Sequence, residues 1–316
     1  MRKVIGIGET VLDIIFKGDD PIGAVPGGSV YNSIISLGRS GVQCAFISET
    51  GNDRVGKRIT SFLRDNGVNA DSVYVYPESK SPLSLAFLNE NHNAEYIFYK
   101  EHSNDRLDFT YPDIQPNDII LYGSYYALNP VIRPQVFAFL DYAKRHGAIL
   151  YYDVNFRNSH KDELTKLRSN MLENFELADI IRGSSEDFEI ICNMSSADKV
   201  YNSEISFYCK NFIYTQGSQP VVLRSGSLRK EYPIQVLGET VSTIGAGDNF
   251  NAGVAFAMIK NNITLDMIQN QLQERQWDEL INYGQLFAAC ACGSMNNYVD
   301  HSFAKQRMEE LSEAAI

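Results

Sequence analysis

The second half of the chain alternates short apolar runs with segments of helical spacing, and this pattern restricts the fold more than any other feature of the sequence. Residues 119–122 read as a buried strand, 136–145 as a helix and 148–152 as the next strand, and shorter strands are expected at 177–181 and 212–215. Such alternation predicts right-handed βαβ units, and therefore an α/β fold with a mainly parallel central sheet flanked by helices. Ligands of such folds bind beyond the carboxyl ends of the strands, so we expect functional residues there.

A glycine-rich stretch at residues 243–250, Thr-Ile-Gly-Ala-Gly-Asp-Asn-Phe, reads as a turn that opens a helix. Apolar side chains follow at helical spacing, at Phe250, Val254, Ala257 and Met258. Gly245 and Gly247 let backbone N–H groups face a ligand, and the helix N-terminus adds partial positive charge. The stretch therefore predicts an anion site.

Asp248 suggests what such a site does. A carboxylate would repel a phosphate that only binds there, but it suits a base that takes a proton from a hydroxyl attacking the phosphate. The alternative is an ordinary helix start, in which Thr243 and Asp248 only cap the first turn.

The residues from Thr243 to Asp248 resemble the C-terminal signature of the ribokinase-like (PfkB) family of carbohydrate and nucleoside kinases, a pattern close to Asp-Thr-x-Gly-Ala-Gly-Asp. Ser242 stands where the pattern has its first Asp. The resemblance extends over nearly the whole chain and implies one ribokinase-like α/β domain over residues 1–316. It further implies Asp248 as the general base and nucleotide contacts at Thr243, Gly245 and Gly247. The N–H groups of Gly245, Ala246 and Gly247 would neutralise charge on the transferring phosphoryl group.

Two N-terminal segments resemble the family's sugar-binding elements. Asp13 follows the first predicted strand, residues 3–9, and a carboxylate there can accept hydrogen bonds from two hydroxyls. Gly27 and Gly28 precede Asn32 at the start of a predicted helix, and this arrangement resembles the family's first signature. The alternative for Asp13 is a solvated strand end.

The resemblance also implies a small β-lid, formed by insertions near 11–25 and 80–101. Residues 83–88 and 95–100 read as two strands of a hairpin around the turn 89–93. In the family this lid covers the sugar and often makes a dimer contact, so a homodimer through the lid is implied.

Three segments at predicted strand ends complete the expected site. Asn155 and Arg157 lie in the sequence Asp-Val-Asn-Phe-Arg, which resembles the Asp-x-Asn-x-Arg segment of the fructokinase and ketodeoxygluconate kinase branches. An Asp/Asn turn would explain Asn155 but not Arg157. The family's Asn-x-x-Glu magnesium element aligns with residues 184–187, where either Glu186 or Asp187 could serve. Nucleotide contacts are expected at Thr215 and Gly217.

Residues 51–57 raise a competing interpretation, because they match the P-loop pattern G-x-x-x-x-G-K in a strand–loop–helix context. Arg58 follows where a P-loop needs Ser or Thr for magnesium, and Asp53 places a carboxylate where triphosphate would lie. A P-loop NTPase acting through Lys57 therefore remains the runner-up.

Composition limits the partners. The chain has 28 Lys and Arg against 39 Asp and Glu, a net charge of −11 without a basic block, which argues against nucleic acid. No apolar run approaches the roughly 20 residues of a membrane span. The five cysteines lack disulfide or metal spacing, so we expect free thiols in a cytoplasmic protein.

Together these features predict an ATP- and Mg²⁺-dependent sugar kinase, for which the resemblance also allows a monovalent cation such as K⁺. The expected substrate is fructose. A second cation beside Arg157 would favour a keto acid, and Lys100 could supply it, but Glu101 follows and weakens the local positive field. The alternatives are 2-keto-3-deoxygluconate or another sugar or nucleoside of the same family, and a non-catalytic sugar-sensing relative.

Overall fold

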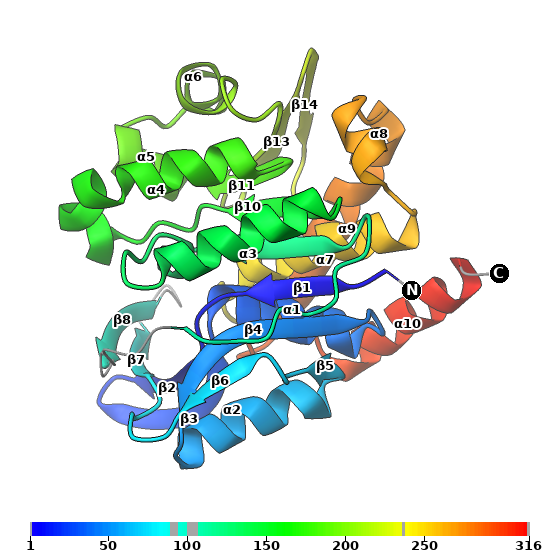
Figure 1. Ribbon diagram of the computed structural model, residues 1–316. Coiled ribbons are helices and arrows are strands. Elements are labelled where there is room, and N and C mark those ends of the chain that lie inside the picture. Colours follow the sequence, from blue (N-terminus) through cyan, green and yellow to red (C-terminus); the bar gives the residue numbers. More distant parts are fainter. Residues whose placement is uncertain (1, 89–93, 100–106, 236–237, 315–316) are drawn as a thin grey trace.

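A computed structural model of the chain describes residues 2–88, 94–99, 107–235 and 238–314. The predicted fold class is confirmed, since a large, mostly parallel sheet runs through the centre and helices cover both faces (Figure 1). Within the described residues no helix is long and apolar enough to cross a bilayer. All five cysteines are free thiols.

The central sheet has ten strands in the order β14-β13-β12-β11-β10-β9-β1-β4-β5, with β6 pairing to β4. Pairing is parallel except at β12–β13 and β13–β14. The bounds are β1 Val4–Ile7, β4 Cys44–Gly51, β5 Val68–Asn69, β6 Val73–Tyr76, β9 Ile119–Gly123, β10 Ile149–Asp153, β11 Ile180–Ser184, β12 Asn211–Gln216, β13 Gln219–Ser225 and β14 Leu228–Tyr232.

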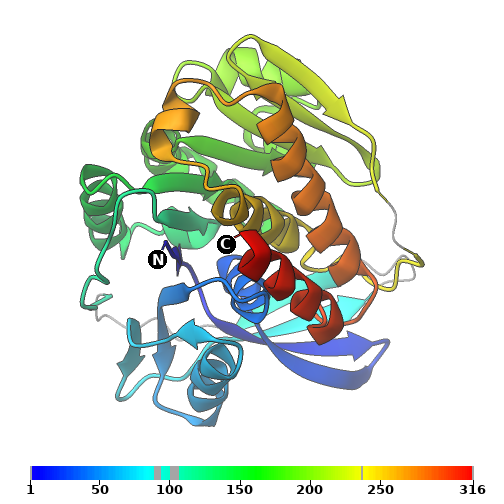
Figure 2. The same cartoon turned by 90° about the vertical axis from the view of Figure 1, so that its right-hand side faces the viewer.

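Helices on the two faces enclose two separate apolar cores. On one face α1, α7, α9 and α10 pack together, and Figure 2 shows α10 lying beside α1. On the other face α3, α4 and α5 lie against β10, β11 and β12. The bounds are α1 Ser29–Arg39, α2 Arg54–Asp65, α3 Arg133–Arg145, α4 Leu164–Leu177, α5 Ser185–Cys192, α6 Ala197–Val200, α7 Ala246–Lys260, α8 Leu265–Gln269, α9 Glu274–Cys292 and α10 His301–Ala314.

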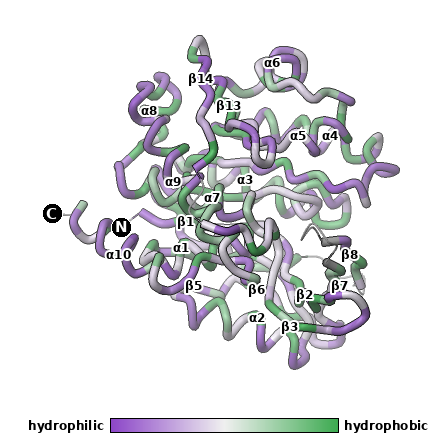
Figure 3. Tube along the Cα trace, turned by 180° about the vertical axis from the view of Figure 1, so that it is seen from behind, coloured by the Kyte–Doolittle hydropathy of each residue, from purple (hydrophilic) through white to green (hydrophobic). Residues whose placement is uncertain are grey.

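Helix α10 illustrates how the sequence pattern sets the packing. Hydrophilic and hydrophobic residues alternate along it (Figure 3), and the inward face carries Ala304, which is buried, and Phe303 and Leu311, which are partly buried. Helix α7 differs, because eleven of its fifteen residues are buried. A helix apolar on all sides belongs in the interior, and α7 lies between α1 and α9.

A second sheet has four strands in the order β3-β2-β7-β8 and lies beside the carboxyl ends of the central strands (Figure 1). Its bounds are β2 Val11–Lys17, β3 Asp20–Gly27, β7 Leu83–Leu88 and β8 Ala94–Tyr99. The predicted hairpin is present, since β7 and β8 pair antiparallel. Its expected turn, 89–93, and Lys100 lie outside the described residues.

The chain order explains where a ligand can bind. From β1 the chain passes to β4 and β5 on one side of the sheet, and later returns to β9, on the other side of β1. Beyond β9 it adds β10, β11 and β12 in sequence. The strand order therefore reverses between β1 and β9, and in open α/β sheets ligands bind at the carboxyl ends beside such a reversal.

Candidate active site

The glycine-rich turn predicted as an anion site leads into the largely buried helix α7. Gly245 precedes the helix with φ 75°, in the left-handed region, and a Cβ there would lie 3.0 Å from the carbonyl oxygen of Asn297. Glycine is therefore required at 245. Among the described residues no acceptor is found for the N–H groups of Gly247 and Asp248, as expected for a helix N-terminus that can bind an anion.

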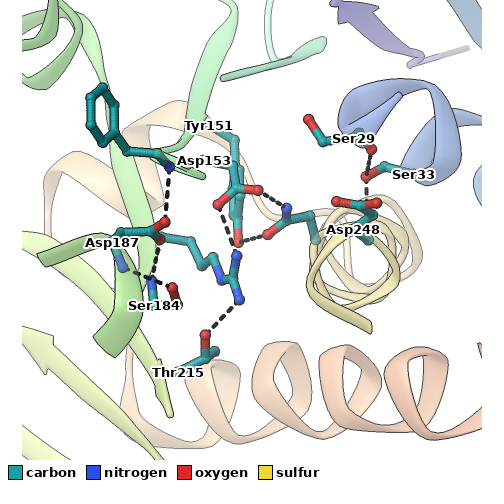
Figure 4. A network of polar contacts seen from close by, with 11 residues as sticks. Ser29, Ser33, Tyr151, Asp153, Ser184, Asp187, Thr215 and Asp248 are labelled. Atoms are coloured by element: carbon teal, nitrogen blue, oxygen red, sulfur yellow. Dashed lines mark hydrogen bonds and ion pairs between the residues drawn. The ribbon is translucent and has the colours of Figure 1, made fainter. Parts of the chain in front are cut away.

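Asp248 lies in the first turn of α7 and is held by α1. It is 8% exposed, and the side-chain amide of Asn32 donates a 2.8 Å hydrogen bond to its Oδ2. The hydroxyl of Ser33 donates to the Asp248 carbonyl oxygen at 2.7 Å, as Figure 4 shows. Because Asp248 and Asn32 are 216 residues apart, only the folded chain brings them together.

Charges around Asp248 tune its protonation. Burial raises the pKa of Asp248 to about 7, and the negative charge of Asp153 adds to this rise. The hydrogen bond from Asn32 and the positive charges of Arg157 and Arg182 act in the opposite direction. A carboxyl with a pKa near 7 can accept a proton at neutral pH and later release it, which is what a general base requires.

A buried arginine, Arg182 on β11, bonds to Asp153 and Thr215, which are both labelled in the polar network of Figure 4. Its Nη1 donates to Asp153 Oδ1 at 3.0 Å, and its Nη2 donates to Thr215 Oγ1 at 2.5 Å. Asn251 of α7 donates to the other oxygen of Asp153 at 2.8 Å. Three neighbouring strand ends and helix α7 are thereby joined through one guanidinium group.

Arg182 also lies against the anion turn. A Cβ at Gly247 would be 3.0 Å from both terminal guanidinium nitrogens, so a side chain at 247 would displace the arginine. The Gly247 φ lies outside the left-handed region, so glycine is needed here for close approach. Arg182 was not predicted from the sequence, although a charged residue directly after the apolar residues Ile180 and Ile181 was a usable signal.

The expected sugar-binding residues lie together at the junction of the two sheets. Asp13 on β2 is 6% exposed, so it is not a solvated strand end. Ser84 of β7 donates to its Oδ1, and Asn297 donates to its Oδ2 at 3.3 Å. A Cβ at Gly27 would lie 2.3 Å from Asp13 Oδ2, and one at Gly28, where φ is 128°, would lie 2.2 Å from the Glu9 carbonyl oxygen.

Burial raises the pKa of Asp13 to about 6, and the charge of Glu9 adds to the rise. The hydrogen bonds from Ser84 and Asn297 favour the ionised form. At neutral pH the group is therefore a buried carboxylate that can accept hydroxyl donors.

The two acidic residues proposed for magnesium have different environments. Both oxygens of Asp187 are occupied by backbone donors, Phe156 N at 2.8 Å and Ser184 N at 2.6 Å, and Ser184 caps α5 in return. Burial raises the pKa of Asp187, and the Arg182 charge opposes that rise. Glu186, the residue before Asp187 in α5, is exposed. The described residues contain no cluster of three or more metal-binding side chains.

The remaining predicted residues flank this centre. Asn155, with φ 36°, and the exposed Arg157 follow β10, whose last residue is Asp153. Thr215 lies on β12 against Arg182. Gly217 forms the β12–β13 turn with φ 59°, and a Cβ there would meet nothing within 4 Å, so its glycine serves the turn. Thr243 and Ala246 flank Gly245, and the Ala246 N–H donates to the Thr243 carbonyl oxygen at 3.2 Å.

The stretch that matches a P-loop lies at the start of α2. Asp53 caps this helix by accepting from Gly56 N at 2.8 Å, and its carboxylate also accepts from Ser81 N at 2.9 Å and Ser81 Oγ at 2.7 Å. The carboxylate therefore takes the donors that a phosphate would need, and Lys57 points to solvent. This geometry favours a capped helix over a nucleotide site.

The chain is similar to known carbohydrate kinases in sequence and in fold. The model of the pfkB family carbohydrate kinases matches residues 1–301. A probable chloroplastic fructokinase-6 of Arabidopsis thaliana is 28% identical over 85% of this chain and 69% of its own length. A 5-dehydro-2-deoxygluconokinase of Geobacillus thermodenitrificans is 24% identical over 74% and 72%. A fructokinase double mutant of Vibrio cholerae O395, crystallised with fructose, ADP and potassium, superposes with a TM-score of 0.82 at 18% identity, covering 98% of both chains.

The buried position of Arg182 predicts a large stability effect. The variant Arg182→Gln leaves two buried carboxylates, Asp153 and Asp187, without their counter-charge, and breaking a buried pair in this way costs about 3–5 kcal/mol. Urea unfolding at pH 8 should show this loss. The loss should shrink at pH 5, because burial raises the pKa of Asp187, and without the Arg182 charge this carboxyl can take up a proton in the folded state.

The matched control is Arg145→Gln, which removes an exposed pair with Asp141 on the surface of α3. Exposed pairs of this kind contribute about 1 kcal/mol or less. A loss for Arg182→Gln no greater than that of the control would contradict the central place given to Arg182.

Proposed function

Because the chain belongs to the PfkB family of carbohydrate kinases, we propose that it transfers the terminal phosphoryl group of ATP to a hydroxyl of a sugar, with Asp248 as the general base. One observation carries this proposal. A buried carboxyl with a pKa near 7 lies in the first helical turn behind a glycine-rich anion turn, between the sugar side of the site and the phosphate side.

In the proposed reaction the sugar lies against Asp13, Gly27, Gly28 and Asn32. Asp248 accepts the proton of the attacking hydroxyl, since Asn32 engages Oδ2 and no described side chain donates to Oδ1. The N–H groups of Gly245 and Gly247, for which no acceptor is found within the described residues, stabilise the charge that develops on the phosphoryl group. The Ala246 N–H, also predicted for this role, donates instead to the Thr243 carbonyl oxygen. The nucleotide extends from this turn toward Thr215, Gly217 and Thr243.

Magnesium fits this site in one particular way. Mg²⁺ keeps several waters and is held by one or two carboxylates together with substrate phosphates, so a cluster of three acidic ligands is not needed. The exposed Glu186 suits that role, whereas Asp187 is engaged by two backbone donors. When bound, the ion would supply positive charge beside the phosphates. For a monovalent cation such as K⁺ we assign no ligands within the described part of the chain.

The proposed substrate is fructose, phosphorylated at a terminal hydroxyl. Fructokinases of plants are 24–28% identical to this chain, and the buried polar groups at the sugar side suit hydroxyls. Arg157 is the cation on the loop after β10, and a buried carboxylate substrate would need a stronger positive field. The alternative is 2-keto-3-deoxygluconate or another sugar or nucleoside, a class supported by the relative that acts on a deoxygluconate derivative.

Further features of the proposal concern assembly and location. The four-stranded sheet is proposed as a lid over the sugar. Ile97 and Tyr99 of β8 are 45% and 57% exposed, and this apolar edge supports a homodimer through the lid.

The cytoplasm remains the proposed compartment, although the Arabidopsis relative is named chloroplastic. Neither a P-loop mechanism nor a purely sensing role accounts for the buried, hydrogen-bonded Asp248.

Replacing the proposed base tests the mechanism. General-base catalysis contributes about 10²–10⁴-fold, so Asp248→Asn should lower kcat by that factor in a coupled ADP-release assay and leave ATP binding nearly unchanged. Lys57→Ala serves as the control and should keep full activity. The opposite pattern, an active Asp248→Asn and an inactive Lys57→Ala, would establish the P-loop mechanism instead.

The different environments of Glu186 and Asp187 predict different phenotypes. Glu186→Ala should fold normally and need more Mg²⁺ for half-maximal activity, because the exposed carboxylate is free to order the hydrated ion. Asp187→Ala removes half of a capping box and should lower the free energy of unfolding by about 0.5–2 kcal/mol. A Mg²⁺ titration of both variants checks this. An unchanged requirement in Glu186→Ala would place the metal elsewhere.

The substrate is tested with a panel of fructose, 2-keto-3-deoxygluconate, ribose, tagatose and adenosine. Fructose should give the highest kcat/KM, and Arg157→Ala should mainly raise its KM. A clear preference for the keto acid would overturn the choice of fructose and leave the kinase mechanism in place.

A further inference from the structure

Asn297 lies in the segment between α9 and α10 and is 2% exposed. Its side chain reaches the sugar side of the site, where Nδ2 donates to Asp13 Oδ2 at 3.3 Å. Its main-chain oxygen accepts from the side chain of Asn249, in α7, at 2.9 Å. One residue therefore contacts both the carboxylate at the sugar side and the helix behind the anion turn.

The orientation of the Asn297 amide is set by Asp13. An ionised carboxylate only accepts hydrogen bonds, so the amide nitrogen must face Asp13 and the amide oxygen must point away. That oxygen is buried and finds no donor within the described residues. A half-satisfied buried amide is costly, and an apolar side chain of the same size would avoid this cost. The asparagine at this position is therefore explained by the hydrogen bond that it donates to the Asp13 carboxylate, and not by its own packing.

The neighbouring residues fix this segment firmly. Tyr298 donates through its hydroxyl to the carbonyl oxygen of Pro26, directly before Gly27. Val299 N donates to Ser36 Oγ of α1 at 3.2 Å, and Ser36 Oγ donates to Asn249 Oδ1 at 2.5 Å. The backbone around Asn297 is thus held by α1, α7 and the turn at Gly27, and the side chain can place Asp13 accurately.

We propose that Asn297 is a positioning residue for the sugar substrate: it holds the Asp13 carboxylate in the orientation that accepts sugar hydroxyls, in fixed relation to the anion turn. The inference rests on the proposed function. Asp13 has a second contact, Ser84 on β7, so without Asn297 the carboxylate stays in place but can rotate about the remaining hydrogen bond. The consequence is weaker sugar binding with little change at the phosphoryl group.

Asn297→Leu provides the main test, because leucine has the same branched side-chain shape and leaves no unsatisfied amide. The urea midpoint of the variant should lie close to that of the wild type, because the loss of one donor to Asp13 Oδ2 is offset by removal of the unsatisfied amide oxygen. Its KM for fructose should rise about tenfold or more, the loss expected for a hydrogen bond to a charged group, with kcat and the KM for ATP within about threefold. Asn296→Leu, at the adjacent exposed position, is the matched control and should leave all three constants unchanged.

A second variant separates positioning from packing. Asn297→Asp sets a carboxylate against Asp13, in surroundings where Glu9 is also charged and Tyr298 is close. At pH 8 its KM for fructose should exceed that of Asn297→Leu, and at pH 6 the two should converge, because a proton shared by the two carboxyls removes the repulsion. A purely structural role would give no such pH dependence.

The outcomes are distinguishable. If the wild type phosphorylates fructose and Asn297→Leu keeps the wild-type KM, the positioning role is overturned and the kinase function stands. If Asn297→Leu loses stability and kcat together, the residue is structural and the inference is again overturned. If the wild type phosphorylates no sugar of the panel, the proposed function itself fails.

Discussion

The hydrogen bond from Asn32 to Asp248 is the contact on which the proposed site depends. It joins α1, which follows the Gly27-Gly28 turn, to α7, which follows the Gly245–Gly247 turn. Ser33 and Ser36 add two further hydrogen bonds between the same helices, at 2.7 and 2.5 Å. Both glycine turns thus lie at one place, and in the proposed function a hydroxyl held by the first would reach a phosphoryl group held by the second.

The burial of Asp248 and its acidic neighbours determines how this contact can act chemically. Asp13, Asp153, Asp187 and Asp248 are all less than 9% exposed, and such a group of carboxylates is stable only where hydrogen bonds and cations compensate it. Arg182 supplies the buried positive charge and Arg157 a second, exposed one. The compensation at Asp248 is incomplete, and its pKa therefore stays near 7. In the proposed function, a protein with a net charge of −11 would obtain its phosphate site from a helix N-terminus and these few cations.

Local sequence motifs predicted most of the fold and part of the candidate site. Strand–helix alternation predicted the parallel sheet, and the glycine turn with its apolar spacing predicted α7, because both patterns depend on neighbouring residues. Arg182 and Asn297 escaped prediction because their roles come from partners distant in sequence, Asp153 and Asp13. The competing environments of Glu186 and Asp187 also could not be predicted, since the Phe156 N–H that occupies Asp187 belongs to a separate strand end. The general-base role of Asp248 stays a prediction.

The pH dependence of kcat/KM for the sugar is the most direct test of that role, because it reports ionisations of the free enzyme. If Asp248 must be ionised to accept the hydroxyl proton, activity should fall as the pH drops through about 7, the pKa of this buried carboxyl. The residual activity of Asp248→Asn should not show this acidic limb, that is, the fall in kcat/KM as the pH drops through about 7. A wild-type profile that is flat between pH 6 and 8, or an identical limb in Asp248→Asn, would contradict the account.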